Sequence, residues 1–213
     1  HQYGNDEYIK GLQSAKKWIY DYSKKDPNFS IVSDRTAELQ PVTSSITYQK
    51  GAWFLHMLRE RMGHDAFKKG IRSYYRDYFN SNATTEDFRR HMEEASHQDL
   101  EIFFKQWLYQ PDNIKLKVNW KYKAAEKKLE IRVEQLQSTG HVFEFPLEWK
   151  VVNKNGSNVD QKALQIKESV STFSIPMESN PFSIQFDPLT VLLARSEEHT
   201  SELQSHSFIS YAV

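Results

Sequence analysis

What the sequence lacks excludes several kinds of chemistry. The 213 residues contain no cysteine, which excludes disulfide bonds, thiolate metal sites and a cysteine nucleophile but does not decide the compartment. No apolar run approaches the length of about 20 residues that a transmembrane helix needs, so we expect no membrane-spanning segment. Basic and acidic residues both number 28. This balance gives no excess of positive charge for nucleic acid or an anionic membrane surface.

Motifs for several common reactions are also absent. The chain has no GxSxG, no Walker loop and no GxGxxG. A metallopeptidase helix needs two histidines four residues apart with a glutamate between them, and no pair has that spacing. His91 and His97 flank two glutamates, but their separation places them on different helix faces, and we interpret them as exposed helix-end residues. His56 is predicted to be a packed or rim histidine. We therefore predict no metal ligands in this chain.

Aromatic residues, by contrast, make up 14% of the chain, which is enough for a substantial core. The first half has apolar residues at the helical period of 3.6. Gly63 is predicted to end one helix, and Thr84 with Asp87 forms a variant of the capping box. The segment from about 27 to 41 has no clear period and is expected to be a loop. The apolar stripes comprise Tyr8, Leu12, Ala15, Ile19 and Tyr22; Ile46, Trp53, Phe54, Met57 and Leu58; Phe67, Ile71, Tyr74, Tyr75 and Tyr78; Phe88, Met92 and Ala95; and Leu100, Phe103, Phe104, Trp107 and Leu108.

In the second half the period changes to 2. Pro111-Asp112-Asn113 interrupts the helical pattern, and about six segments with alternating apolar residues follow. Asn155-Gly156 is a strong hairpin signal between two of them. This spacing predicts a small antiparallel β-sandwich. We expect an α+β chain, with a helical region at 1–110 and a β-sandwich domain at 112–193. The alternating segments are 114–120, 129–133, 143–151, 164–166, 173–175 and 182–186.

The last 19 residues have a different origin in our interpretation. Residues 195–205, RSEEHTSELQS, match the translation of a sequencing adapter, and ISYAV at 209–213 matches the constant string that follows the adapter's index. We therefore treat 195–213 as an artefactual tail and expect it to lack defined packing.

Three segments together resemble the zinc aminopeptidases of peptidase family M-one, the membrane alanyl aminopeptidase group. They are ITYQKGAWFLHML at 46–58, NATTEDFRRHMEEASHQDLEIFFKQW at 82–107, and QLQSTGHVFEFPLE at 135–148. Each motif alone is moderately specific, but their order and spacing fit over nearly all of the chain before the tail.

This resemblance implies that the helical region is the C-terminal part of a thermolysin-like catalytic domain. It also implies that the zinc-binding helix lies upstream of His1. Because the chain starts with histidine rather than methionine, we expect it to be truncated there. The zinc cofactor would belong to the full-length parent, its ligands would be absent from this chain, and the chain alone would be inactive. The expected partners are peptide substrates, and the compartment stays undetermined.

The resemblance also assigns roles to individual residues. In the family, the tyrosine that matches Tyr48 directs its phenol at the oxyanion of the tetrahedral intermediate, so Tyr48 is the predicted catalytic residue. A tyrosine phenol stays protonated at neutral pH and can supply such a donor. Gln49 replaces the more common glutamate. Thr43 and Ser44 are candidates for binding the substrate's first side chain, although helix capping explains them equally well. Gly51 is interpreted either as allowing close backbone packing or simply as a small helical residue.

Three functional hypotheses follow. The first is a fragment of a zinc-dependent metallo-aminopeptidase, a hydrolase that releases N-terminal residues from peptides. The second is a non-catalytic family relative that acts as a protein-binding scaffold. The third, an unrelated helical module joined to an adhesive sandwich, is disfavoured by the ordered motifs. The retained segment around Tyr48 favours the enzyme over the scaffold, and the upstream sequence would discriminate between these two.

Overall fold

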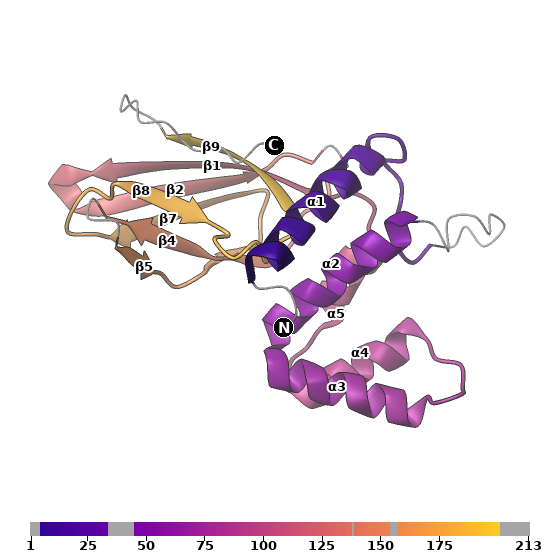
Figure 1. The fold of residues 1–213 in the computed structure, drawn as a ribbon. Helices are drawn as coiled ribbons and strands as arrows, with labels where there is room; N and C mark the ends of the chain where they lie inside the picture. Colours follow the sequence, from indigo (N-terminus) through magenta and orange to yellow (C-terminus); the bar gives the residue numbers. More distant parts are fainter. Residues whose placement is uncertain (1–4, 34–44, 138, 154–156, 201–213) are drawn as a thin grey trace.

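The computed structural model describes residues 5–33, 45–137, 139–153 and 157–200. Its helices gather at one side and its strands at the other (Figure 1). This arrangement confirms the predicted α+β class. The change of hydrophobic period at 111–113 therefore marks the join between the two parts, since the first strand begins at Ile114.

The helices follow the predicted apolar stripes. They are α1 Asn5–Ser23, α2 Ser45–Met62, α3 His64–Asp77, α4 Thr85–Ser96 and α5 Glu101–Phe104. Gly63 has a φ of 84° and donates its backbone N–H to Arg59, which confirms it as a helix end. Thr84 and Asp87 exchange hydrogen bonds in a complete capping box at the start of α4. Local signals thus set the helix ends correctly.

Two details of the helical part differ from the prediction. After α5, residues Lys105–Tyr109 continue as a π-helical turn instead of an α-helix. His91 is buried, with only 4% of its surface exposed, whereas the sequence suggested an exposed residue. Its ring lies 3.0 Å from the Ser73 hydroxyl and packs edge-on against Tyr74 and Tyr78. The prediction was wrong because α4 turns this face toward α3.

The strands form three sheets. A four-stranded sheet has the order β7-β2-β1-β9, a two-stranded sheet pairs β3 with β6, and a three-stranded sheet has the order β5-β4-β8. Within 112–193 every pairing is antiparallel, as predicted. The strands are β1 Ile114–Lys123, β2 Lys128–Gln135, β3 Phe145–Leu147, β4 Trp149–Val152, β5 Asn158–Asp160, β6 Leu164–Ile166, β7 Val170–Pro176, β8 Ser183–Phe186 and β9 Ala194–Thr200.

The predicted strand at 143–151 is two strands. Phe145 and Leu147 lie in β3, which pairs with β6, whereas Trp149 and Val151 lie in β4, which pairs with β5 and β8. All four side chains are buried. The alternation therefore continues through a point where the chain passes from one sheet to another. Side-chain periodicity reports which face is buried and does not report which strand is the hydrogen-bonding partner.

The predicted artefactual tail also departs from expectation. Residues 194–200 form β9, which runs parallel to β1 with Ile114 opposite Ala194 and Trp120 opposite Thr200. The expectation that this tail lacks defined packing is wrong for residues 195–200, while 201–213 lie outside the described residues. The physical reason is that β1 has a second edge of backbone donors and acceptors that an extended segment can satisfy.

Residues of the quoted motifs join the helical part to the sandwich. The Gln106 side chain, 4% exposed, donates to the Glu144 carbonyl at 2.7 Å and accepts from the Glu144 N–H at 2.9 Å. Beside it, Trp107 packs on Phe143 with ring centroids 5.3 Å apart. Trp107 is buried, which confirms it as a core residue. Gln135 donates to the Phe143 carbonyl at 2.8 Å and so fixes the same segment from the sheet side.

A second junction uses the loop after β8. The Asp187 carboxylate accepts hydrogen bonds from the backbone N–H groups of Val191 and Leu192 at 2.7 and 3.1 Å. His56, buried as predicted, lies 3.2 Å from the Thr190 carbonyl and 2.9 Å from the Tyr8 hydroxyl. This loop therefore contacts α2, and His56 connects it to Tyr8 of α1.

The charge state of Asp187 leads to a stability prediction. Burial raises the pKa of Asp187 to about 6, against the opposing effect of Lys16. A raised carboxyl pKa stabilises the fold below the unfolded pKa, and this contribution is lost as pH rises toward 6. Asp187→Asn keeps one oxygen for the backbone N–H groups and removes the half-buried charge. We expect the variant to gain stability relative to the parent between pH 4 and pH 7, by up to about 3 kcal/mol.

Urea denaturation at several pH values measures this difference, and Asp187→Ala is the control. The alanine variant has no side-chain oxygen to accept from the backbone N–H groups of Val191 and Leu192. It should be less stable than the parent at both pH 4 and pH 7. If Asp187→Asn changed stability equally at pH 4 and pH 7, the buried-carboxylate account would be wrong.

Candidate active site

The predicted catalytic residue Tyr48 lies in the first turn of α2. Its side chain is 72% exposed, unusually high for an aromatic residue in this chain. Within the described part of the chain, the phenol hydroxyl makes no hydrogen bond. The hydroxyl is therefore available to an external group.

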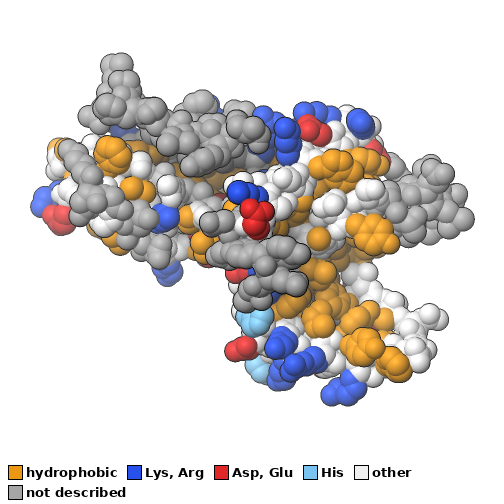
Figure 2. All heavy atoms as spheres, viewed as in Figure 1, with side chains coloured by type: hydrophobic (Ala, Val, Ile, Leu, Met, Phe, Trp, Pro, Cys, Tyr) orange, Lys and Arg blue, Asp and Glu red, His pale blue; other side chains and the backbone are white. Residues whose placement is uncertain are grey.

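Tyr48 borders an open groove of about 610 Å³. Tyr48, Gly51, Ala52 and Leu55 contribute one wall from successive turns of α2. Hydrophobic side chains gather on the visible face over α2 and over α3 and α4 (Figure 2). The remaining described lining residues come from other segments: Ile31, Val32, Thr47, Phe54, Tyr74, Ala83, Thr84, Thr85, Phe88 and Leu108.

The opposite wall is held by short local bonds. Thr84 donates its backbone N–H to the Asp87 carboxylate at 3.0 Å, and Asp87 donates its own N–H back to the Thr84 hydroxyl at 3.2 Å. Hydrogen bonds from the Tyr78 and Thr84 side chains lower the pKa of Asp87 to about 2. The carboxylate is thus ionised at neutral pH, and the capping box stays intact. On a third side, Val32 donates to the Leu108 carbonyl at 2.9 Å.

Two residues after Tyr48, Lys50 anchors the buried side of α2. It is 3% exposed, and its ammonium donates to the Asp112 carbonyl at 3.1 Å. The ammonium also lies 5.9 Å from the centre of the Phe29 ring. Burial lowers the pKa of Lys50 to about 8. Lys50 therefore fixes the start of the Tyr48 helix against the segment that leads into the sandwich.

The positions of the two other predicted site residues are not described by the structure. Thr43 and Ser44 lie outside the described residues. Over the ranges that the structure describes, no three or more histidine, aspartate or glutamate side chains are arranged to hold a metal ion. The residues present there do not fit a zinc site. Tyr48 is the predicted site residue that the structure positions.

Sequence reasoning missed most of the groove. A stripe at 48, 51, 52 and 55 was available, since these positions share one helical face. The stripe through Trp53, Phe54 and Met57 is the stronger signal, because these residues form the core. The structure also corrects one interpretation of Gly51. A Cβ built there meets no atom within 4 Å, so close packing does not require glycine at this position.

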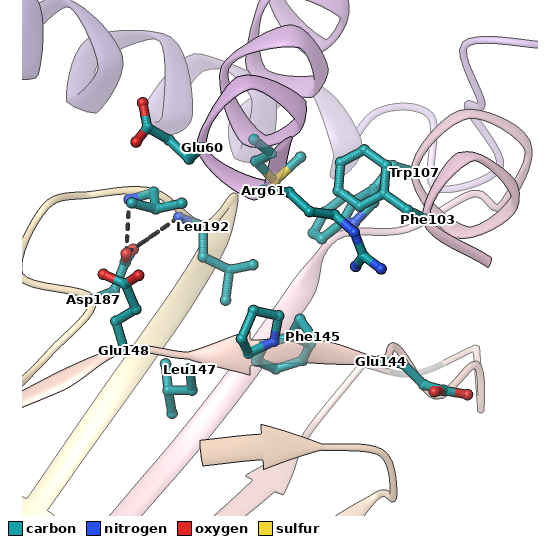
Figure 3. A pocket seen from close by; sticks show the side chains of 13 residues that line it. Glu60, Arg61, Phe103, Trp107, Glu144, Phe145, Leu147, Glu148, Asp187 and Leu192 are labelled. Carbon is teal, nitrogen blue, oxygen red and sulfur yellow. Dashed lines mark hydrogen bonds between the residues drawn. The ribbon is translucent and has the colours of Figure 1, made fainter. Parts of the chain in front are cut away.

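A second hollow lies between the two parts of the fold (Figure 3). It has a volume of about 80 Å³, with Phe103 and Trp107 on the helical side and Phe145 and Leu147 on the strand side. Glu60, Glu148 and Asp187 lie at one end of it in the view shown. Its lining includes the residues that join the two parts, and its volume is far below that of the Tyr48 groove. The groove is therefore the stronger candidate site.

Among the described helices, none has an apolar stretch of the length that a bilayer requires.

Comparisons with known proteins show which proteins this chain is similar to. Residues 4–107 match the model of the peptidase family M1 domain. Aminopeptidase N of Lactococcus lactis subsp. lactis is 38% identical over 68 residues, or 32% of this chain and 8% of that protein. Glutamyl aminopeptidase of Rattus norvegicus is 28% identical over 127 residues, or 57% of this chain and 13% of that protein. The chain thus spans a small part of the length of these relatives.

A solved structure supports the fold independently. Legionella pneumophila aminopeptidase A, crystallised in complex with aspartic acid, superposes with a TM-score of 0.65 over 87% of this chain and 23% of that chain, at 14% identity. The order of the helical part and the sandwich, the quoted motifs and these matches agree. Over residues 4–107 the chain thus matches peptidase family M1.

Proposed function

We propose that this chain is part of a zinc-dependent metallo-aminopeptidase that releases N-terminal residues from peptides. The observation that carries the proposal is the exposed Tyr48 phenol beside an open groove, inside the stretch that matches the family. The relatives that match are named aminopeptidases, which supports the same reaction class.

In this proposal Tyr48 stabilises the tetrahedral intermediate. Attack of water on the scissile carbonyl places negative charge on the carbonyl oxygen, and the phenol donates its O–H to that oxygen. Because the charge is largest in the transition state, such a donor lowers the barrier more than it strengthens substrate binding. Lys50 supports this role by fixing the first turn of α2 through the Asp112 carbonyl. The zinc ligands and the groups that bind the substrate's amino terminus would come from the rest of the parent protein.

Thr43 and Ser44 remain candidates for binding the first side chain of the substrate. They directly precede α2, which begins at Ser45. Substitution of each by alanine in the full-length enzyme would test this role through the preference among aminoacyl anilides that differ only in that side chain. A preference unchanged in both variants would assign these residues to helix capping.

The proposal also predicts how the isolated chain behaves toward zinc. A tight site needs three or four converging ligands. We expect calorimetric titration of the 213-residue chain with zinc to show no stoichiometric sub-micromolar site, and we expect no hydrolysis of aminoacyl anilides. Stoichiometric tight binding would show that the zinc ligands lie in this chain after all. The test of Tyr48 itself is the Tyr48→Phe variant of the full-length enzyme.

A further inference from the structure

The loop after β8 has an unusual backbone conformation. Asp187 and Thr190 have positive φ values of 47° and 54°, a region that residues with a Cβ seldom adopt and that persists only where surrounding contacts hold it. The Asp187 carboxylate provides two such contacts from inside the loop, by accepting from the N–H groups of Val191 and Leu192 (Figure 3). The Thr190 carbonyl provides another, at 3.2 Å from Nε2 of His56. Two titratable side chains therefore hold the loop, one within it and one on α2.

The neighbours of His56 determine where its proton sits. A carbonyl oxygen can only accept, so the Nε2 that faces Thr190 must carry the hydrogen. The other nitrogen, Nδ1, lies 2.9 Å from the Tyr8 hydroxyl and 3.4 Å from the Arg59 guanidinium. Because a guanidinium has only donors, Nδ1 must be the acceptor. The neutral ring thus links the loop, through Nε2, to Tyr8 of α1, through Nδ1.

A second proton on this ring would break the link. Nδ1 would become a donor that faces the donors of Arg59, and the Tyr8 hydroxyl could no longer donate to it. Glu60 is the neighbour that favours the proton, with an oxygen 4.0 Å from Nδ1. Its carboxylate, however, already accepts two hydrogen bonds from Arg59, at 2.8 and 3.1 Å. The groups that face the ring from α1, α2 and the loop therefore match its neutral form.

The energetics have the same sign. Burial, aided by Arg59, lowers the pKa of His56 against the opposing effects of the Thr190 carbonyl and Glu60. A histidine whose pKa is lowered in the folded state takes up its proton more readily once it is released to water, where the pKa is about 6.5. As pH falls below that value, proton uptake favours states in which the ring has left its site.

We propose that His56 is an acid-sensitive latch, whose protonation at Nδ1 releases the loop 187–192 from α2 and α1. Asp187 acts in the opposite direction on the same loop. Burial raises the pKa of Asp187 to about 6, with Lys16 opposing the shift and Glu148 adding to it. Loss of the Asp187 proton destabilises the loop as pH rises, whereas the latch opens as pH falls. The sign of the pH dependence therefore separates the two groups.

Hydrogen exchange of the 213-residue chain at the Val191 and Leu192 amides, between pH 5 and pH 8, tests the latch. His56→Gln keeps an N–H donor for the Thr190 carbonyl and cannot be protonated. The ratio of the parent's exchange rate to that of the variant cancels the intrinsic pH dependence of exchange. From pH 7.5 to pH 5 this ratio should rise several-fold, toward a limit of about thirtyfold set by a released ring with a pKa near 6.5. A ratio independent of pH would overturn the latch.

Two further variants keep the test decisive. His91→Gln is the matched control, since His91 is as buried as His56 but lies on α4 beside Ser73. It should keep the parent's pH dependence. Arg59→Gln removes the cation that faces Nδ1 and frees Glu60 to accept from the protonated ring, so the acid effect should shrink. This variant decides the matter if His56→Gln fails to fold, and an undiminished acid effect in it would contradict the latch. The exchange readout needs neither zinc nor substrate, so its failure would leave the proposed function untouched.

Discussion

Tyr48→Phe in the full-length enzyme should reduce kcat by about 10²–10³, equivalent to about 3–4 kcal/mol. KM should change little, because the phenol bonds mainly to an oxygen whose charge develops in the transition state. The substitution keeps the ring and removes only the hydroxyl. Since 72% of the Tyr48 side chain is exposed, the fold should be unaffected, and circular dichroism should be unchanged.

Steady-state kinetics on an aminoacyl anilide measures this effect. Tyr75→Phe is the matched control, because Tyr75 is 64% exposed on α3 and does not line the groove. It should keep the parent's kcat. A folded Tyr48→Phe enzyme with near-normal turnover would reduce Tyr48 to a surface residue and remove the catalytic assignment.

Trp107→Ala should destabilise the chain by about 3–5 kcal/mol, the usual cost of removing a buried tryptophan side chain. Trp107 is 3% exposed and packs between Phe103 and Phe143, with ring centroids 6.4 and 5.3 Å away. Because Phe143 leads into the sandwich, the cavity would open at the junction of the two parts. Trp107→Ala should therefore loosen their contact as well as lower the free energy of unfolding.

Urea denaturation followed by tryptophan fluorescence and circular dichroism measures this loss. Trp18→Ala is the control, because Trp18 is 40% exposed on α1. We expect it to cost far less. Equal losses in the two variants would contradict the assignment of Trp107 to the junction.

The helices and the fold class could be predicted because their signals are local. The period of 3.6 residues predicts the apolar faces of the helices. The Thr84–Asp87 pair correctly predicts the start of α4, and Gly63 correctly predicts the end of α2. The burial of His91 was missed because it depends on how α4 packs against α3. In the same way, the split of 143–151 into β3 and β4 depends on strand partners far along the chain.

The candidate site could be predicted only in part. The resemblance identified Tyr48, and the structure places it on an open groove. The groove itself needs α3, α4 and the segment at 31–32 to converge on one face of α2. Its signal in the sequence, Gly51 and Ala52 beside Tyr48, was too weak to separate from an ordinary helix. The pairing of β9 with β1 likewise depends on strand partners far apart in the sequence.

The most direct test of the central claim is the release of amino acids from two peptides that differ only in N-terminal acetylation. The full-length, zinc-loaded enzyme should release the first residue from the free peptide and leave the acetylated one intact, since an aminopeptidase requires a free amino terminus. A folded, zinc-loaded protein that cleaved neither peptide would contradict the enzyme account and favour the non-catalytic scaffold.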